Sequence, residues 1–380
     1  MTFGALLLVL LLIAGAAGAV AYYMDRRGRG IITRISPYTD GLLAILEVDP
    51  MRAIQRLREA VAADTSNIDA YIRLGTLYAD TGDLPRAIKL HRSLTLRADM
   101  SAKQKLEVYR ALANDYMKAG DSTRTLEAVN HLLSQSKKDS WALEMKTNLL
   151  STRGDWNGAF ETAVKLNGLG TSASNRRLAV LKTMEGLRLC RENKERDGRI
   201  QFREAIKYDF AFVAPYLYWG DSYVREDRTE DAVKIWKRLL EVNSDKSYLV
   251  FERLETHLFE LGRFSEIEQI YRKVNRDHPQ NVHAYTALAR FLEKRGDAGD
   301  AITVLRNGLE QNPNSLWLRR RLIQLFADVN DVEQVIEMAR EILARVMEDH
   351  YEFTCSACGY VSHEPLWLCP KCSKLDTFGV

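Results

Sequence analysis

The chain has 380 residues, of which 46% are hydrophobic and 28% are charged, so it can bury a sizeable core and hold two or three domains. Its 54 basic and 51 acidic residues leave a formal net charge of only +3, which gives no reason to expect general attraction to nucleic acid. Ala, Leu, Arg, Glu and Lys are abundant and proline is scarce, as is typical of helices. We therefore expect an all-α body.

The first predicted element is an apolar helix at residues 1–24. No charged side chain occurs from Thr2 to Met24, and a helix of that length spans a hydrocarbon core of about 30 Å. Basic residues are enriched on the cytoplasmic side of such helices. Here they follow the apolar run, as Arg26, Arg27, Arg29 and Arg34. The sequence predicts a single-pass transmembrane anchor, a basic juxtamembrane linker at residues 25–33, and a cytoplasmic location for the rest of the chain.

Two other interpretations of this segment are a cleaved secretory signal and a buried soluble helix. Ala17-Gly18-Ala19 resembles a signal cleavage site, but the basic n-region of a signal is missing and the charge asymmetry is reversed. A uniformly apolar helix at a chain end has little around it to pack against. The membrane anchor fits better, and a cytoplasmic body implies reduced thiols.

A repeated pattern extends over residues 34–348. One copy has Tyr71, Leu74, Gly75 and Tyr78, then Gly82-Asp83 and Ala87. Similar units begin near Arg34, Ile68, Leu106, Ser140, Ala179, Val213, Tyr248, Val282 and Leu316, mostly 34 or 35 residues apart, with two spacings of 38 and 39. This pattern resembles the tetratricopeptide repeat. The resemblance implies about nine helix-turn-helix units stacked into a right-handed superhelix with an extended concave surface.

Within each unit the apolar residues are spaced as on one face of a helix. Small residues, such as Gly75 with Ala87 and Gly220 with Ala232, are expected to let the two helices approach closely. A Gly-Asp or similar pair is expected to end the first helix and turn the chain back. The aromatic residues of the pattern are expected to lie mostly in the core.

Tetratricopeptide arrays generally bind peptides or proteins. By repeat position, we expect the side chains of Arg110, Asn114, Arg290 and Lys294 to face a partner on the concave surface, although each is also a common kind of solvated polar residue. Cys190 is expected to behave as a small buried apolar residue. The run Arg319-Arg320-Arg321 is expected to form a solvated helix face.

The last segment, residues 349–380, is too short to fold by apolar burial alone. It contains two C-x-x-C pairs, Cys355 with Cys358 and Cys369 with Cys372. This spacing is typical of four thiolates around one tetrahedral metal ion, either zinc or iron, in a structural site with no open coordination position. The alternatives are two disulfides in an oxidising compartment, or a histidine ligand at His363 in place of one thiolate.

The familiar catalytic motifs of nucleotide-binding enzymes, metalloproteases and serine hydrolases are missing from the sequence. We therefore expect no enzyme activity and no cofactor other than the metal ion.

The order of these parts, with "YYMDRRGR" after the apolar run and "CSACGY" and "WLCPKC" in the tail, resembles the lipopolysaccharide assembly protein B (LapB) family. The resemblance implies a rubredoxin-like metal ribbon with Cys355, Cys358, Cys369 and Cys372 as ligands, packed against the repeats. It also implies an adaptor at the inner membrane, facing the cytoplasm. Its implied partners are the membrane protease FtsH, the lipid A deacetylase LpxC and lipopolysaccharide assembly proteins.

Three other functions stay open at this point. The chain could be a general envelope-assembly scaffold without a role in proteolysis, or an electron carrier with one iron in the ribbon. Nucleic-acid binding through the ribbon is the third, and the near-neutral charge argues against it.

Overall fold

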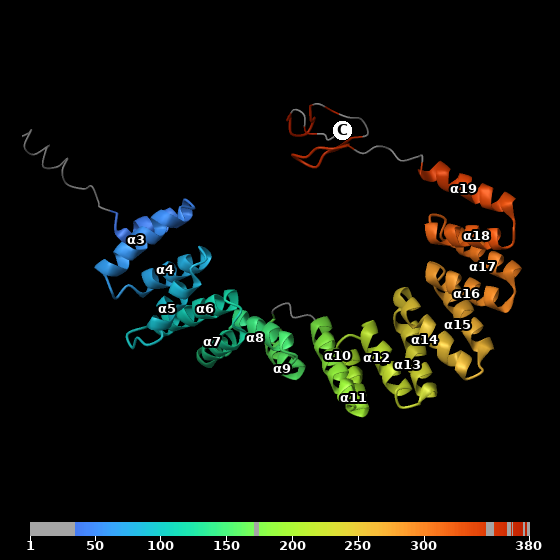
Figure 1. Ribbon diagram of the computed structural model, residues 1–380, viewed down its shortest axis with the longest axis horizontal. Helices are drawn as coiled ribbons and strands as arrows, with labels where there is room; N and C mark the ends of the chain where they lie inside the picture. The colour runs from blue at the N-terminus through green and yellow to red at the C-terminus, as the bar shows by residue number, and fades with distance from the viewer. Residues whose placement is uncertain are drawn as a thin grey trace, which may run out of the picture. The chain divides into compact units, whose positions relative to one another are not determined.

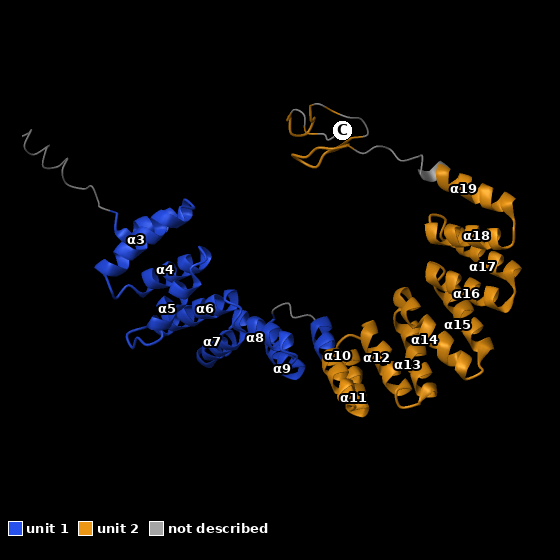
Figure 2. Cartoon of the chain, in the orientation of Figure 1, with its two compact units in different colours: residues 1–181 blue, residues 182–380 orange. Residues whose placement is uncertain are grey.

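The structure is a computed structural model, and it describes residues 35–170, 175–346, 353–362, 366, 368–374 and 377. The chain divides into two compact units, residues 1–181 and residues 182–380 (Figure 2). The described residues form 18 α-helices, one short 3-10 helix and a two-stranded sheet. No helix among them is both long and apolar enough to cross a membrane, and the predicted anchor lies outside the described residues.

The first unit consists of helical hairpins that follow one another along the chain (Figure 1). Its helices are α2 (Pro37–Leu46), α3 (Pro50–Ala63), α4 (Ile68–Asp80), α5 (Leu84–Leu94), α6 (Ala102–Lys118), α7 (Ser122–Gln135), α8 (Ser140–Thr152) and α9 (Trp156–Asn167). Helix α10 (Asn175–Arg191) contains the boundary between the two units.

The second unit continues the hairpins and includes the carboxyl-terminal ribbon. Its elements are α11 (Glu195–Tyr208), α12 (Val213–Val224), α13 (Thr229–Val242), η1 (Ser244–Lys246), α14 (Tyr248–Glu260), α15 (Phe264–Asp277), α16 (Val282–Arg295), α17 (Ala298–Gln311), α18 (Leu316–Asp328), α19 (Val332–Val346), β1 (Phe353–Thr354) and β2 (Val361–Ser362). The two strands are antiparallel, with Phe353 opposite Ser362.

The predicted repeat units agree with the observed hairpins. Six of the nine predicted starts coincide with the first residue of a helix, at Ile68, Ser140, Val213, Tyr248, Val282 and Leu316. Helix α6 begins four residues before the predicted Leu106, because Ser101 and Gln104 form a capping box that starts the helix one turn earlier. In the first unit, the first described helix begins at Pro37, where Ser36 is the N-cap.

The Gly-Asp pairs turn the chain as predicted. Gly82 has a φ of 89°, a conformation in which a side chain is unfavourable, and this ends helix α4. The next residue, Asp83, accepts a hydrogen bond from the backbone N–H of Arg86 at 3.2 Å and so caps helix α5. The two residues thus perform separate tasks in one tight turn.

The aromatic residues of the repeat pattern contribute to the core, as expected. Tyr216 and Trp236 are fully buried, and Tyr285 is 6% exposed. Cys190 is also buried, in agreement with its prediction as a small apolar residue.

Because Gly220 has no side chain, a large side chain of the neighbouring helix can pack directly against its backbone. A Cβ atom at Gly220 would overlap the indole of Trp236, and one at Gly75 would overlap the imidazole of His91. In both hairpins the large residue lies one helix across, on the second helix of the same unit. The small residue therefore makes space for a specific aromatic side chain, in addition to the neighbouring alanine that the sequence pattern suggested.

This packing leads to a prediction for glycine substitutions. Gly220→Ala is expected to destabilise the protein by roughly 1–3 kcal/mol, because Trp236 must move and its N–H loses its bond to the carbonyl of Leu217. Gly299→Ala is the matched control, because nothing lies within 4 Å of the added Cβ in helix α17. There alanine should stabilise by about 0.5–1 kcal/mol. Urea unfolding of both variants measures the difference, and equal effects would contradict the packing argument.

The prediction for Arg319-Arg320-Arg321 as a solvated face is wrong for the first residue. Arg319 is only 2% exposed, with its Nε atom 3.7 Å from Glu341 Oε2. Its position in helix α18 is the one that large buried residues occupy in other repeats. Arg320 lies over the ring of Trp317 and Arg321 pairs with Glu293, so these two are partnered at the surface.

A buried pair of hydrogen-bonded side chains joins two successive hairpins of the first unit. His91 on helix α5 is fully buried, and its Nδ1 atom lies 2.6 Å from Asp115 Oδ2 on helix α6. Its Nε2 atom lies 3.0 Å from the backbone carbonyl of Ile72 on helix α4. Both ring nitrogens therefore lie within hydrogen-bonding distance of oxygen atoms on neighbouring helices. The pair thus ties helices α4, α5 and α6 together through one side chain.

Candidate metal centre and partner surfaces

Two similar loops carry the four cysteines of the ribbon. In the first, Cys355 N–H donates to the carbonyl of Tyr360 at 2.9 Å, and Gly359 N–H donates to the carbonyl of Cys355 at 2.9 Å. Gly359 has a φ of 68°, as its place after the first C-x-x-C pair predicts.

The second loop repeats this arrangement. Cys369 N–H donates to the carbonyl of Lys374 at 3.0 Å, and Ser373 N–H donates to the carbonyl of Cys369 at 2.8 Å. Ser373 also has a positive φ, of 54°. Each loop is thereby closed by the same pair of backbone hydrogen bonds, and each directs two thiols to the same side.

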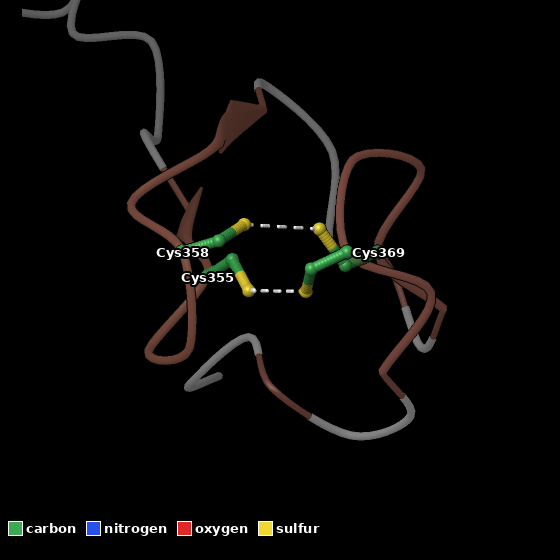
Figure 3. A group of neighbouring side chains, drawn as sticks. Cys355, Cys358 and Cys369 are labelled. Carbon is green, nitrogen blue, oxygen red and sulfur yellow. Dashed lines mark hydrogen bonds between the residues drawn. The ribbon is translucent and has the colours of Figure 1, made fainter.

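The four sulfur atoms meet between the two loops. All of them lie within 4.8 Å of one another. Cys355 Sγ is 3.8 Å from Cys372 Sγ, and Cys358 Sγ is 3.6 Å from Cys369 Sγ (Figure 3). A disulfide bond would bring two sulfurs to about 2.05 Å, so the four thiols are separate.

These distances suit a tetrahedral metal ion. Four sulfurs at about 2.3 Å from a central ion are roughly 3.8 Å from one another, which is close to the separations seen here. Cys355 and Cys369 are buried, and the other two thiols are half-buried. The donor set therefore fits zinc or iron, and it is complete without a fifth ligand. His363, the alternative ligand, lies outside the described residues.

The surroundings of Cys355 favour a thiolate. Its sulfur is hydrogen-bonded with the hydroxyl of Thr377 at 3.1 Å, and this bond, together with the backbone N–H groups of Ala357 and Cys358, lowers the pKa of Cys355 to about 6. Because thiolates are the form that binds metal ions, this thiol is prepared for coordination near neutral pH.

Arg110 and Asn114, two of the predicted partner residues, line one groove of the first unit. The groove has a volume of about 650 Å³ and runs between helices α4 and α6. Arg110 donates to Asp139 at 2.6 Å and lies over the ring of Trp141. Asn114 is half-buried in the same groove.

Arg290 and Lys294, the other two predicted partner residues, converge on one carboxylate of the second unit. Arg290 donates to Glu255 at 2.9 Å, and Lys294 donates to it at 2.7 Å. The hydroxyl of Tyr271 also donates to Glu255, at 3.1 Å. Burial raises the pKa of Glu255, but the hydrogen bonds and positive charges of Lys294 and Arg290 outweigh burial and lower it below the usual range.

The sequence interpretation missed Glu255. It occupies the repeat position at which other hairpins have a small residue, Gly75, Gly220 or Ala289. A charged residue at a position that is otherwise small is a signal that could have identified it. Arg290 and Lys294 on helix α16 pair with this carboxylate. This pairing explains the orientation of their side chains without a protein partner.

Comparisons with known proteins agree with this architecture. The chain matches the tetratricopeptide repeat family at residues 49–102 and 258–319, and the rubredoxin metal binding domain at residues 353–379. It is 21% identical over 378 residues to lipopolysaccharide assembly protein B of Escherichia coli (strain K12). It is 24% identical over 387 residues to the protein of the same name from Haemophilus influenzae. Each alignment covers 97% of both chains.

Over nearly its whole length, this chain is similar to the lipopolysaccharide assembly protein B family. The similarity extends over both parts of the chain, because each alignment covers 97% of it and the family models match the repeats and the ribbon. Among solved structures, a tetratricopeptide repeat protein from Parabacteroides merdae is 13% identical, with a TM-score of 0.32, 76% of this chain covered and 96% of that chain. The resemblance to the lipopolysaccharide assembly protein B family that the sequence indicated is confirmed by the two alignments and the family matches.

Proposed function

We propose that this chain is a non-enzymatic adaptor of lipopolysaccharide assembly, held at the inner membrane by residues 1–24 and facing the cytoplasm. The observation that supports it most is the alignment over 97% of both chains with relatives named lipopolysaccharide assembly protein B. In this proposal, residues 25–33 are a basic linker, residues 34–348 bind protein partners, and residues 349–380 form a metal-dependent ribbon.

We further propose that Cys355, Cys358, Cys369 and Cys372 hold one zinc or iron ion. The sulfur separations and the complete set of four donors support this assignment. Bound there, the ion would cross-link the two loops and would leave no position for a substrate. Elemental analysis of the purified protein identifies the metal. A red protein that bleaches on reduction would favour the alternative, an electron carrier with one iron.

The finer proposal is that the adaptor presents the deacetylase LpxC to the membrane protease FtsH, and that Arg110, Asn114, Arg290 and Lys294 contribute to partner contacts. The groove along helices α4 and α6 supports a contact at Arg110 and Asn114, because it is large enough for a peptide segment and bears mixed polar groups. Arg290 and Lys294 keep exposed side chains even though both pair with Glu255.

The test is the lifetime of LpxC in cells with and without this protein. Deletion is expected to lengthen the half-life of LpxC and to raise lipopolysaccharide content. An unchanged half-life would remove the link to proteolysis and leave the alternative, a general envelope-assembly scaffold. Purification from detergent extracts separates the same two functions, because only the first requires the protease in the complex.

Variants of the groove test the surface itself. The double change Arg110→Ala with Asn114→Ala is expected to reduce recovery of LpxC with the tagged protein several-fold. Arg86→Ala is the matched control, because Arg86 is a 70% exposed arginine of the same unit that contacts Asp83 and Tyr78 and does not line the groove. Equal recovery from both variants would exclude this groove as the binding surface.

A further inference from the structure

The tip of the first described hairpin exposes three apolar side chains. Leu46 at the end of helix α2 is 79% exposed, Val48 in the turn is 85% exposed, and Met51 in the first turn of helix α3 is 75% exposed. The two carboxylates of the same turn are engaged by Arg52. Its guanidinium donates to Glu47 at 2.8 Å, and its backbone N–H donates to Asp49 at 3.0 Å. The tip therefore presents an apolar cluster whose charged neighbours are already satisfied.

Val48 also has an unfavourable backbone conformation. Its φ of 59° is in the left-handed region, where a β-branched side chain is strained. In each hairpin of the described repeats, one residue with a positive φ follows the first helix. In the other eight hairpins it is glycine, asparagine or aspartate: Gly82, Gly120, Gly154, Asn193, Asp227, Gly262, Gly296 and Asn330. Only this hairpin has an apolar β-branched residue there, and it points into solvent.

This exposure coincides with the end of the stack. The outer face of a terminal repeat is normally polar, because no further repeat covers it. Here Ile35 and Leu43 are exposed as well, so the first described hairpin presents apolar side chains beyond those of its tip. A strained backbone conformation at an exposed apolar residue indicates that the residue has a functional role and does not serve to stabilise the fold.

The bilayer is the surface that this tip can always reach. The predicted membrane-spanning run ends at Met24, and helix α2 is capped by Ser36. Twelve extended residues span at most about 40 Å. The ten residues of helix α2 add about 15 Å. The tip therefore stays within about 55 Å of the end of the anchor and can reach the membrane surface, whereas a protein partner would have to be recruited to it.

We propose that Leu46, Val48 and Met51 insert into the boundary between the headgroups and the acyl chains of the bilayer. This second contact, together with the anchor, restricts the orientation of the first hairpin on the membrane. The inference rests on the membrane anchor of the proposed function, but on no particular protein partner. Apolar side chains supply the driving force, as in other peripheral membrane contacts.

Photo-cross-linking tests this contact in the full-length protein. A diazirine amino acid is placed at position 48, and the protein is reconstituted in vesicles of phosphatidylethanolamine and phosphatidylglycerol. Illumination is expected to give adducts with lipid. The same probe at position 96 is the control, because Leu96 is 86% exposed in the same unit but lies outside a hairpin tip. Lipid adducts no more frequent than at position 96, or adducts with a second copy of the chain, would overturn the proposal.

Vesicle flotation separates this inference from the anchor. A chain that floats with the vesicles but gives no lipid adduct at position 48 retains its anchor and lacks the tip contact. A chain that does not float lacks the anchor, and the proposed membrane location then fails together with the inference.

The strain at Val48 provides a second test. Val48→Asn places a residue there that accepts the left-handed conformation, so the melting temperature is expected to stay the same or rise. With the probe moved to position 51, the yield of lipid adducts should fall several-fold in this variant. A raised melting temperature with an unchanged adduct yield would show that the side chain of Val48 makes no contact with lipid.

Discussion

Cys369→Ser is expected to abolish metal binding and to unfold the ribbon, while the helical hairpins stay folded. The described core of this domain is small, since Cys355 and Cys369 are packed only by partly buried residues such as Phe353, Tyr360 and Leu366. A structural zinc ion contributes about 10–16 kcal/mol to the folding of domains of this size. No other interaction in the described part of the ribbon approaches that magnitude. Metal content and hydrogen exchange at residues 353–374 measure the loss.

Cys190→Ser is the matched control for this experiment. Cys190 is the one cysteine outside the ribbon, and it is buried in the repeat array. Its substitution is expected to leave the metal content unchanged. A strong chelator should reproduce the effect of Cys369→Ser on the unmodified protein. A ribbon that keeps its protection from hydrogen exchange after the metal is removed would contradict a metal-dependent fold.

Asp115→Ala is expected to destabilise the first unit by about 1–3 kcal/mol. It leaves Nδ1 of His91 buried and facing an empty space in place of Asp115 Oδ2. Removal of one partner from a buried hydrogen-bonded pair has an effect of this size, because the remaining polar group is left unsatisfied away from water. Urea unfolding followed by hydrogen exchange in helices α4 to α6 locates the loss.

Asp80→Ala removes an ion pair of similar length at the surface and is the control for this prediction. Asp80 accepts from Lys118 at 2.6 Å, and both side chains are at least 41% exposed. Solvent screens such a pair, so its loss should change the free energy of unfolding by less than about 1 kcal/mol. Equal effects of Asp80→Ala and Asp115→Ala would show that the buried pair does not hold the hairpins together.

Much of the repeat array was predictable from the sequence because each hairpin depends on local signals. The apolar period gives the helices, and a glycine-aspartate pair such as Gly82-Asp83 gives the turn. The start of helix α6 was missed because the capping box of Ser101 begins before the repeat motif does. A helix boundary set by capping lies outside a pattern defined by core residues.

Contacts between hairpins were much less predictable. The pair of His91 and Asp115 joins residues 24 positions apart, and nothing local in the sequence marks either one. Arg290 and Lys294 were placed on a partner surface from their repeat positions, but the carboxylate of Glu255 that holds them was not foreseen. For the ribbon, the C-x-x-C spacing was sufficient to predict that four sulfurs would meet, because two short loops leave few other arrangements.

The stacking of the hairpins has a mechanical consequence. Within the second unit, successive hairpins pack on one another, as α16 does on α14 and α18. Small rotations at successive contacts therefore add up, so such a stack bends and stretches like a soft spring under small loads. A bound partner that pulls on one hairpin would deform the neighbouring hairpins before it dissociated. The contact with the partner would therefore persist over a longer displacement than a rigid domain allows.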